Sequence, residues 1–367
     1  MLYNWQRPDW PNFSFNLVAM EDILYRFAEE TGYVTGLLES IPVSQQQEII
    51  INSMVAEAVK TSAIEGEFLS RQDVVSSIRN KLGLSPNNKT PKDLKAIGAG
   101  ELMVKVRNTY KEPLTEKVLL EWHALLLKGA RHINLSSWRK GKEPMQVISG
   151  PFGNETVHFE APPSNRVATE MNKFIRWFND TAPGELNEIK SPPVRSAIAH
   201  LYFESIHPFE DGNGRIGRAI AEKALSQSIK RPVLLSLSRI IEANKAEYYQ
   251  QIKLAQRGNE ITAWVDYFVN VIVKAQQETI QQVSFTLQKT KFMDAFKNEL
   301  NERQLKVVLK MLDAGPEGFE GGMTAKKYIS ITKTSKPTAT RDLQHLTELG
   351  ALLNQGGGRN THYTLNI

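Results

Sequence analysis

Residues 207–218 of this 367-residue chain read HPFEDGNGRIGR. The segment follows an apolar stretch at a proline turn, and a new helical pattern starts within it. Gly212 and Gly214 flank Asn213, and glycine allows backbone amides to point into a concave loop. The N-terminus of the following helix adds the positive end of its dipole. The segment therefore predicts an anion site at a helix N-terminus.

Several side chains of the segment suit a bound phosphate. Arg215 and Arg218 are spaced i and i+3 on one face of the first helical turns, and arginine fits the planar geometry of phosphate oxygens. Asp211 is an oxygen donor of the kind that Mg²⁺ prefers. His207 can transfer a proton near neutral pH. Together they predict a Mg²⁺-bound di- or triphosphate beside a base for an attacking hydroxyl.

Each feature has a simpler explanation when it is taken alone. A Gly-Asn-Gly is usually a turn, and a lone histidine is more often structural than catalytic. Two arginines on a helix usually face solvent. Contiguous residues that all fit one site favour the functional interpretation, and the absence of GxxxxGK[ST] excludes a nucleotide loop of the P-loop type.

The segment matches HxFx[DE]GNGRxxR at every defined position, and on these residues the chain resembles the Fic family over roughly residues 95–255. Fic proteins are mostly α-helical and usually transfer AMP from ATP to a Ser, Thr or Tyr hydroxyl of a target protein. The resemblance implies a protein adenylyltransferase with ATP as substrate and Mg²⁺ as cofactor. Transfer of phosphate or UMP is the alternative within the enzymes.

The resemblance also implies a role for each matching residue. His207 is the general base, Phe209 anchors the loop to the core, and Asp211 is the Mg²⁺ ligand. The resemblance places an aromatic residue at the adenine, for which Tyr249 is preferred over its neighbour Tyr248. Packing in the core is an equal alternative for Tyr249. The implied ATP- and phosphate-binding residues are Gly212, Asn213, Gly214, Arg215, Ile216, Gly217, Arg218 and Tyr249.

Residues 144–163 change from the helical pattern to two short strands joined by a turn, PFGN at 151–154. The resemblance implies that residues 145–163 form a flap, on which a target segment docks as an added strand at Val157, His158 and Phe159. Such docking aligns a segment through main-chain hydrogen bonds without demanding its sequence. An ordinary surface hairpin is the alternative.

The segment TSAIEG at residues 61–66 resembles the inhibitory motif of the family, [ST]xxxE[GN], through Thr61, Glu65 and Gly66. The resemblance implies that Glu65 pairs with Arg218 and so removes the group that would hold the γ-phosphate. The alternative is a solvent-facing glutamate before a helix-capping glycine. In some relatives the same glutamate supports hydrolytic removal of AMP from targets, which the sequence leaves open.

The spacing of apolar residues indicates that most of the chain is helical. The expected fold is mainly α, with a helical Fic core, a small β-hairpin flap and a C-terminal winged helix-turn-helix. We expect three domains: an N-terminal helical region at 1–94 with the inhibitory helix at about 44–66, a Fic domain with its following helices at 95–295, and a third domain at 296–367. Helices are expected at 15–40, 44–64, 70–82, 92–109, 114–130, 164–182, 191–206, 214–229, 238–256 and 261–293.

The last segment has the order of a winged helix-turn-helix, with helices at 302–313, 324–331 and 338–349 before a hairpin around GGGRN. Residues 324–367 hold six Lys and Arg residues against Asp342 and Glu348. Residues 300–367 could bind DNA or serve as a protein-binding module, and the two alternatives are equal. If they bind DNA, the chain would be a transcriptional regulator whose Fic domain senses a nucleotide. The side chains available to DNA would be Thr338, Thr340, Arg341, Gln344 and Arg359.

The composition is ordinary for a globular protein, with 41% apolar and 23% charged residues. The absence of cysteine excludes disulfides, thiolate metal sites and cysteine nucleophiles, and it favours a reducing compartment. No stretch reaches the ~18 apolar residues of a membrane span, and the N-terminus lacks a signal-peptide pattern. We therefore expect a cytoplasmic protein without a membrane partner. A homodimer, the target protein and modification of the chain itself are left open.

Overall fold

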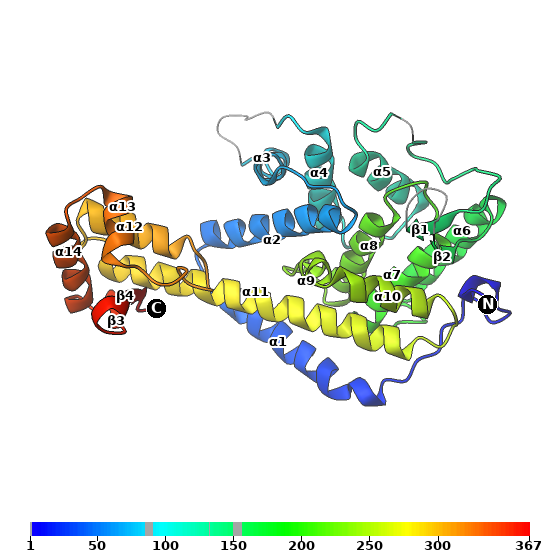
Figure 1. The fold of residues 1–367 in the computed structure, drawn as a ribbon. Coiled ribbons are helices and arrows are strands. Elements are labelled where there is room, and N and C mark those ends of the chain that lie inside the picture. The colour runs from blue at the N-terminus through cyan, green and yellow to red at the C-terminus, as the bar shows by residue number, and fades with distance from the viewer. Residues whose placement is uncertain (1, 85–90, 132, 150–155) are drawn as a thin grey trace. The chain divides into compact units, whose positions relative to one another are not determined.

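The computed structural model describes residues 2–84, 91–131, 133–149 and 156–367. The described chain is mainly helical and contains two separate two-stranded antiparallel sheets (Figure 1). It divides into two compact units, Met1–Gly32 with Gln46–Gln277 and Tyr33–Gln45 with Glu278–Ile367. This division differs from the three expected domains because the N-terminal helices share a core with the helices around the signature segment.

The helices lie close to the ranges that the apolar spacing predicts. One difference is a break of the expected helix 238–256 at Asn244, whose backbone is not helical (φ −140°, ψ 59°) and whose side chain donates to Glu247. Asparagine commonly bonds to nearby groups in this way at the expense of the helix. The helices are α1 (Glu21–Glu39), α2 (Val43–Ile64), α3 (Arg71–Lys81), α4 (Leu94–Asn108), α5 (Glu116–Leu126), α6 (Ser164–Asp180), α7 (Pro192–Ile206), α8 (Asn213–Ser228), α9 (Leu237–Ala243), α10 (Lys245–Ala255) and α11 (Thr262–Phe296).

Two further expected ranges are too long. The first expected helix begins as a short 3-10 turn at Val18–Met20, so α1 starts only at Glu21. The helix expected over 114–130 ends at Leu126. The start of this helix is well defined, because the Thr115 side chain accepts a hydrogen bond from the amide of Val118 and so caps the first turn.

Helices α7 and α8 pack against each other at the centre of the first unit (Figure 1). Every residue of α7 from Pro193 to Ile206 is buried, including Arg195, His200 and Glu204. A helix that is buried all round belongs to a core. Charged residues in such a helix need partners within the protein.

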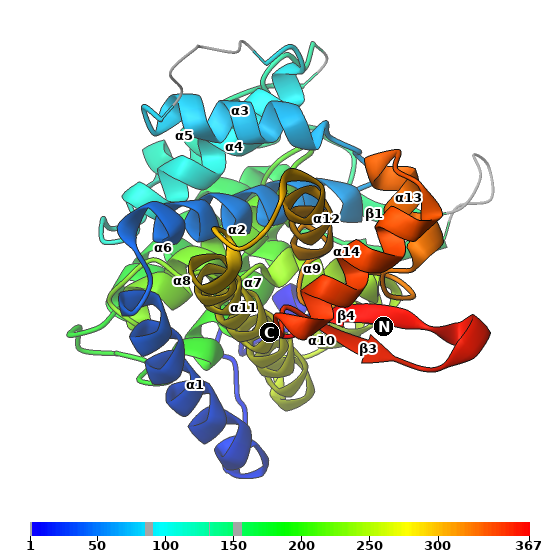
Figure 2. The same ribbon diagram turned by 90° about the vertical axis from the view of Figure 1, so that its left-hand side faces the viewer.

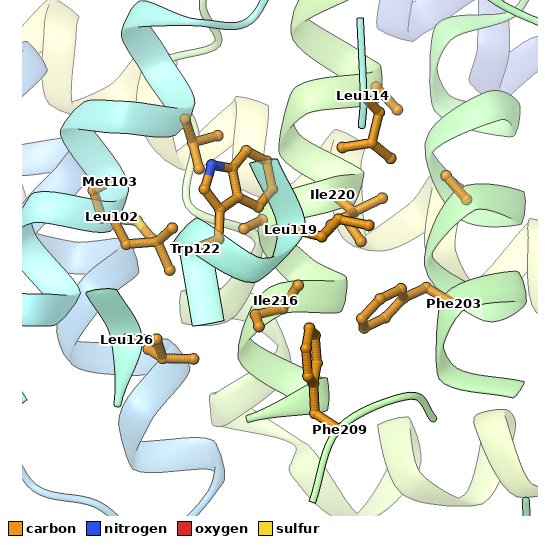
Figure 3. Packing of buried hydrophobic residues seen from close by; sticks show 14 of the residues in the cluster. Leu102, Met103, Leu114, Leu119, Trp122, Leu126, Phe203, Phe209, Ile216 and Ile220 are labelled. Carbon is orange, nitrogen blue, oxygen red and sulfur yellow. The ribbon is translucent and has the colours of Figure 1, made fainter. Parts of the chain in front are cut away.

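The loop between α7 and α8 is anchored in the core by Phe209 (Figure 3). Its ring is fully buried and stacks on the His123 ring, with centroids 4.1 Å apart. Trp122 of α5, Phe203 of α7 and Ile216 of α8 lie in the same cluster. The signature segment therefore joins two buried helices through a buried aromatic ring.

The second unit contains α12 (Glu302–Leu312), α13 (Ala325–Thr332), α14 (Lys336–Glu348) and the hairpin of β3 (Leu352–Gln355) with β4 (His362–Leu365). The hairpin lies beside α14 (Figure 2). Met323 and Tyr363 exchange two backbone hydrogen bonds of 2.8 Å, which add a short bridge to β4. The order of these elements is the one expected from the sequence.

Within the described residues, no helix has both the length and the apolar character that crossing a membrane would require.

Replacing Phe209 with alanine tests the anchor. Phe209→Ala leaves a cavity in the first unit, and we expect it to lower the free energy of unfolding by about 3–5 kcal/mol. Urea denaturation followed by tryptophan fluorescence measures this, since all six tryptophans lie in the first unit. The control is Phe68→Ala, because Phe68 is 86% exposed. Equal stability of the Phe209→Ala and Phe68→Ala proteins would contradict the anchoring role.

Candidate active site

The signature loop is held closed by Asn213. The amide of Phe209 donates to Asn213 Oδ1 at 2.9 Å, and Asn213 Nδ2 donates to the Phe209 carbonyl at 2.9 Å. His207 and Gly212, at either end of the loop, have left-handed backbones with φ of 51° and 84°. The side chain of Asn213, expected to bind phosphate, is thus engaged with the loop itself, while its backbone starts α8.

Arg139 is a functional residue that the sequence analysis missed. Its Nε donates to the His207 carbonyl at 2.8 Å, and its guanidinium also bonds the carbonyls of Ile206 and Pro162. Burial lowers the pKa of Arg139 to about 10. A histidine at positive φ is strained, and Arg139 ties that strained position to the segment that follows the hairpin.

A cavity of about 680 Å³ opens beside the loop. This volume lies in the range of small-molecule sites. Its lining comes from the segment after α2, from α7, from the loop and start of α8, from α10 and from the hairpin. The lining residues used below are Glu65, Val147, His158, Phe159, Glu204, His207, Gly214, Tyr248, Tyr249 and Lys253.

The hairpin consists of β1 (Gln146–Ser149) and β2 (Thr156–Glu160). Its register pairs Val147 with Phe159 and Ile148 with Val157, so His158 is the extra residue of a bulge. His158 lines the cavity, with its Nδ1 3.4 Å from Lys253 Nζ. The expected turn at 151–154 lies outside the described residues.

The three expected docking residues of the hairpin differ in exposure. Val157 is exposed, and His158 is half-buried. Phe159 is 1% exposed and packs in the core of the first unit. Phe159 therefore anchors the hairpin, and the surface available for docking lies at Val157 and His158.

Two residues of the TSAIEG motif, Thr61 and Glu65, bond to Arg218, and the Glu65–Arg218 pair is the one that the resemblance implies. Arg218 is fully buried; its Nε donates to Thr61 Oγ1 at 2.7 Å, and its NH2 donates to the Thr61 carbonyl at 3.0 Å and to Glu65 Oε1 at 2.7 Å. Burial alone would lower the pKa of Arg218, but Glu65, with smaller contributions from Tyr248 and Glu204, raises it overall. Gly66, at φ 81°, turns the chain away directly after Glu65.

The other arginine of the signature is paired as well. Arg215 contacts Glu67 through NH1 and Asp211 Oδ1 through NH2 at 3.2 Å. Glu67 also accepts a hydrogen bond of 2.7 Å from Lys95. No sequence motif marks Glu67, although it lies only two residues beyond Glu65. One short segment thus supplies a carboxylate to each signature arginine.

Asp211 is the candidate magnesium ligand. Its side chain is 49% exposed, and Oδ1 accepts a hydrogen bond of 2.6 Å from the Gly212 amide. The described residues contain no group of three or more His, Cys, Asp or Glu that could hold a metal. Mg²⁺ is commonly bound by one or two carboxylates together with substrate phosphates. A single accessible carboxylate at a helix N-terminus fits that mode.

Two residues expected to bind phosphate face elsewhere. Ile216 is fully buried in the core, and its amide donates to the Gly212 carbonyl (Figure 3). Gly217 faces α7, where an added Cβ would lie 2.5 Å from Glu204 Oε1 and 3.0 Å from His200 Nδ1. Both residues pack α8 rather than line the cavity. Residues 212–217 also fit the letters GxGxxG, but helix α7 precedes them, whereas a dinucleotide loop follows a strand.

The neighbouring residues Tyr248 and Tyr249 differ in burial and in their contacts. Tyr248 is buried, with its hydroxyl 2.8 Å from His200 Nε2. Tyr249 is 41% exposed and lines the cavity, and its hydroxyl donates to the Ile64 carbonyl at 3.2 Å. Burial and the charge of Glu65 raise the pKa of the Tyr249 hydroxyl. Of the pair, Tyr249 is the one placed to meet a ligand.

Two family models match the chain. Residues 3–84 match a domain of unknown function (DUF4172), and residues 113–225 match the Fic/DOC family. The second match contains the hairpin and the signature loop, and the first contains Thr61, Glu65 and Gly66.

Curated relatives include the protein adenylyltransferase fic-1 of Caenorhabditis elegans, 29% identical over 164 residues, and the protein adenylyltransferase Fic of Drosophila ananassae, 26% identical over 223 residues. These matches cover 45% and 60% of this chain. They cover only 27% and 39% of the two relatives, so the chain spans less than half of each.

Solved structures show the same fold. A Fic family protein from Desulfovibrio desulfuricans G20 has a TM-score of 0.57 at 19% identity, over 97% of this chain and 98% of that chain. A Fic domain containing signaling protein from Bacteroides thetaiotaomicron has a TM-score of 0.56 at 18% identity, over 72% of this chain and 97% of that chain. Residues 113–225 therefore form a Fic/DOC domain within a mainly helical Fic fold.

Proposed function

We propose that the chain is an autoinhibited protein adenylyltransferase, which transfers AMP from Mg-ATP to a Ser, Thr or Tyr hydroxyl of a target protein. The observation that carries the proposal is the loop at 207–218. His207 and Gly214 at the start of α8 line one cavity, and the accessible carboxylate of Asp211 belongs to the same loop. The curated relatives named protein adenylyltransferase support the reaction type.

The reaction follows from the chemistry of these residues. The hydroxyl oxygen of the target attacks the α-phosphorus of ATP, and His207 takes its proton. A bond from oxygen to the α-phosphorus forms, the bond from the α-phosphorus to the bridging oxygen breaks, and pyrophosphate leaves. The amides at the N-terminus of α8 and the guanidinium of Arg218 hold the phosphates. Mg²⁺, held by Asp211 and the phosphates, would supply further neutralising charge.

The hairpin is the proposed docking site for the target. On β2, Val157 is exposed, and the half-buried His158 lines the cavity. An extended target segment added to this hairpin would be aligned by main-chain hydrogen bonds, with its hydroxyl toward His207. This mode suits several target sequences.

The inhibitory part of the proposal depends on Glu65. In this structure Glu65 holds the guanidinium that a triphosphate would need, and it places negative charge where more negative charge must bind. A neighbouring carboxylate, Glu67, occupies Arg215 in the same way. Removal of AMP from a modified target, supported by Glu65, is the alternative use of this glutamate.

We expect Glu65→Gly to raise AMP transfer roughly tenfold to a hundredfold, because a charge-assisted hydrogen bond of about 1.5–3 kcal/mol no longer competes with ATP. Intact-mass spectrometry after incubation with Mg-ATP measures the transfer, with the chain itself as surrogate target. The control is Glu65→Gly with His207→Ala, which should gain no AMP. Equal modification of the wild-type and Glu65→Gly proteins would contradict inhibition by Glu65.

We expect Glu67→Gln to raise transfer less, by roughly twofold to fivefold, because Glu67 is partly exposed and also pairs with Lys95. The same assay of AMP incorporation measures this change. The matched control is Glu48→Gln, since Glu48 lies on α2 and pairs with Arg79 at the surface. If Glu67→Gln changes transfer no more than Glu48→Gln does, pairing with Glu67 does not keep Arg215 from binding phosphate.

DNA binding by the second unit is a second candidate function. We infer that this unit is a winged helix-turn-helix whose recognition helix is α14. This helix buries Ala339 and Leu343 and exposes Thr340, Arg341 and Gln344. Its carboxylate Asp342 is turned inward onto Arg303, which leaves the outer face free of that charge.

Fluorescence anisotropy of the full chain with a labelled random-sequence duplex tests this candidate. We expect binding at low salt in the range of about 10⁻⁴–10⁻⁶ M, weaker at higher salt, since phosphate contacts release counterions. Arg341→Gln should weaken binding, whereas Arg79→Gln in the first unit should not. Absence of binding at low salt would exclude DNA as the partner and favour a protein-binding module.

A further inference from the structure

Behind His207 lies a buried polar group that the proposed reaction does not use. Glu204 stands one helical turn before His207 on α7 and is 6% exposed. Its carboxylate Oε2 lies 3.6 Å from His207 Nδ1. Burying a carboxylate costs desolvation free energy unless a partner compensates for it, so Glu204 needs a partner.

One buried atom of each of these two side chains lacks a hydrogen-bond partner. Among the described residues, His207 Nδ1 and Glu204 Oε1 are both buried without a hydrogen bond. Gly217 makes the space, because a Cβ there would lie 2.5 Å from Glu204 Oε1. Hydrogen bonds of catalytic groups are often long before substrate binds. The 3.6 Å separation of Glu204 Oε2 and His207 Nδ1 is longer than a hydrogen bond and must shorten for the two to form one.

The charges around Glu204 come from several elements. On α7, burial lowers the pKa of His200, which favours a neutral ring. Arg218 on α8 is already paired with Glu65, and Tyr248 on α10 bonds to His200. Burial alone would raise the pKa of Glu204, but the neighbouring His207 and the guanidinium of Arg218 lower it. An anion therefore faces the imidazole of His207.

We propose that Glu204 is a positioning residue for His207. Its carboxylate keeps the ring proton on Nδ1, so that Nε2 is left as the base for the target hydroxyl. It also stabilises the imidazolium that forms when His207 takes the proton. A buried carboxylate beside the catalytic histidine of a Ser-His-Asp triad has the same role. This inference rests on the proposed function for the reaction that it serves, but the pairing itself does not need that reaction.

The first test measures the pairing without any transfer. Nitrogen-15 NMR of the imidazole rings distinguishes the two tautomers, and the loss of one ring signal in His207→Ala assigns His207. We expect the Nδ1–H tautomer in the wild-type chain and in Glu204→Gln, whose amide oxygen still accepts. In Glu204→Met the Nε2–H tautomer should dominate. An Nε2–H ring in the wild type, or no change in Glu204→Met, would overturn the proposal.

The second test measures the effect on transfer in the Glu65→Gly background. We expect Glu204→Gln to slow AMP incorporation about tenfold and Glu204→Met about a hundredfold, within the usual contribution of a general base. With Glu204→Gln the acidic limb of the pH–rate profile should move about one pH unit lower, because the imidazolium loses its stabilising anion.

The matched control is Glu170→Gln, since Glu170 is an equally buried carboxylate on α6 that bonds Trp10 and Arg166. Its pH–rate profile should be unchanged. A slower rate with an unchanged profile in Glu204→Gln would reduce Glu204 to a structural residue and contradict the proposal. If Glu65→Gly transfers no AMP at all, the proposed function fails, while the NMR measurement still decides whether Glu204 and His207 are paired.

Discussion

A fully buried guanidinium needs an anionic or hydrogen-bonding partner to offset the loss of water, and the other contacts of the candidate site are arranged around the partner of Arg218. In this structure Thr61 and Glu65 satisfy this need, with donor–acceptor distances of 2.7–3.0 Å. The terminal phosphate of a nucleoside triphosphate also offers anionic oxygens that a guanidinium binds. Under the proposed function, the Glu65 carboxylate and the nucleotide therefore compete for Arg218.

The frame around Arg218 is held by core packing and hydrogen bonds. Helix α7 is buried along its length, and the loop that follows it is fixed by Phe209, Asn213 and Arg139. The strained backbone of His207 is therefore determined from both sides. The segment after α2 is less constrained, since Glu65 and Glu67 are partly exposed. In the proposed function, inhibition is therefore released by movement of this segment, and the loop at 207–218 stays in place.

The sequence predicted the parts of the site that depend on local chemistry. A contiguous signature indicated the loop, the helix start and both arginines, and two short strands around a Pro/Gly/Asn turn indicated the hairpin. It could not give contacts between distant segments, such as Arg139 on the His207 carbonyl or Glu67 on Arg215, because no local pattern marks them. It also could not tell which face of α8 meets the cavity, so Ile216 and Gly217 were expected at phosphate although they pack in the core. The hairpin showed the same limit at Phe159, whose burial follows from packing against the rest of the unit.

The most direct measurement is a crystal structure of the Glu65→Gly chain with Mg²⁺ and a non-hydrolysable ATP analogue. The account predicts that the Arg218 guanidinium contacts the γ-phosphate, that the β- and α-phosphates lie on the amides at the start of α8, and that His207 faces the α-phosphorus. A triphosphate bound away from Arg218, or an analogue that leaves His207 remote from the α-phosphorus, would contradict it.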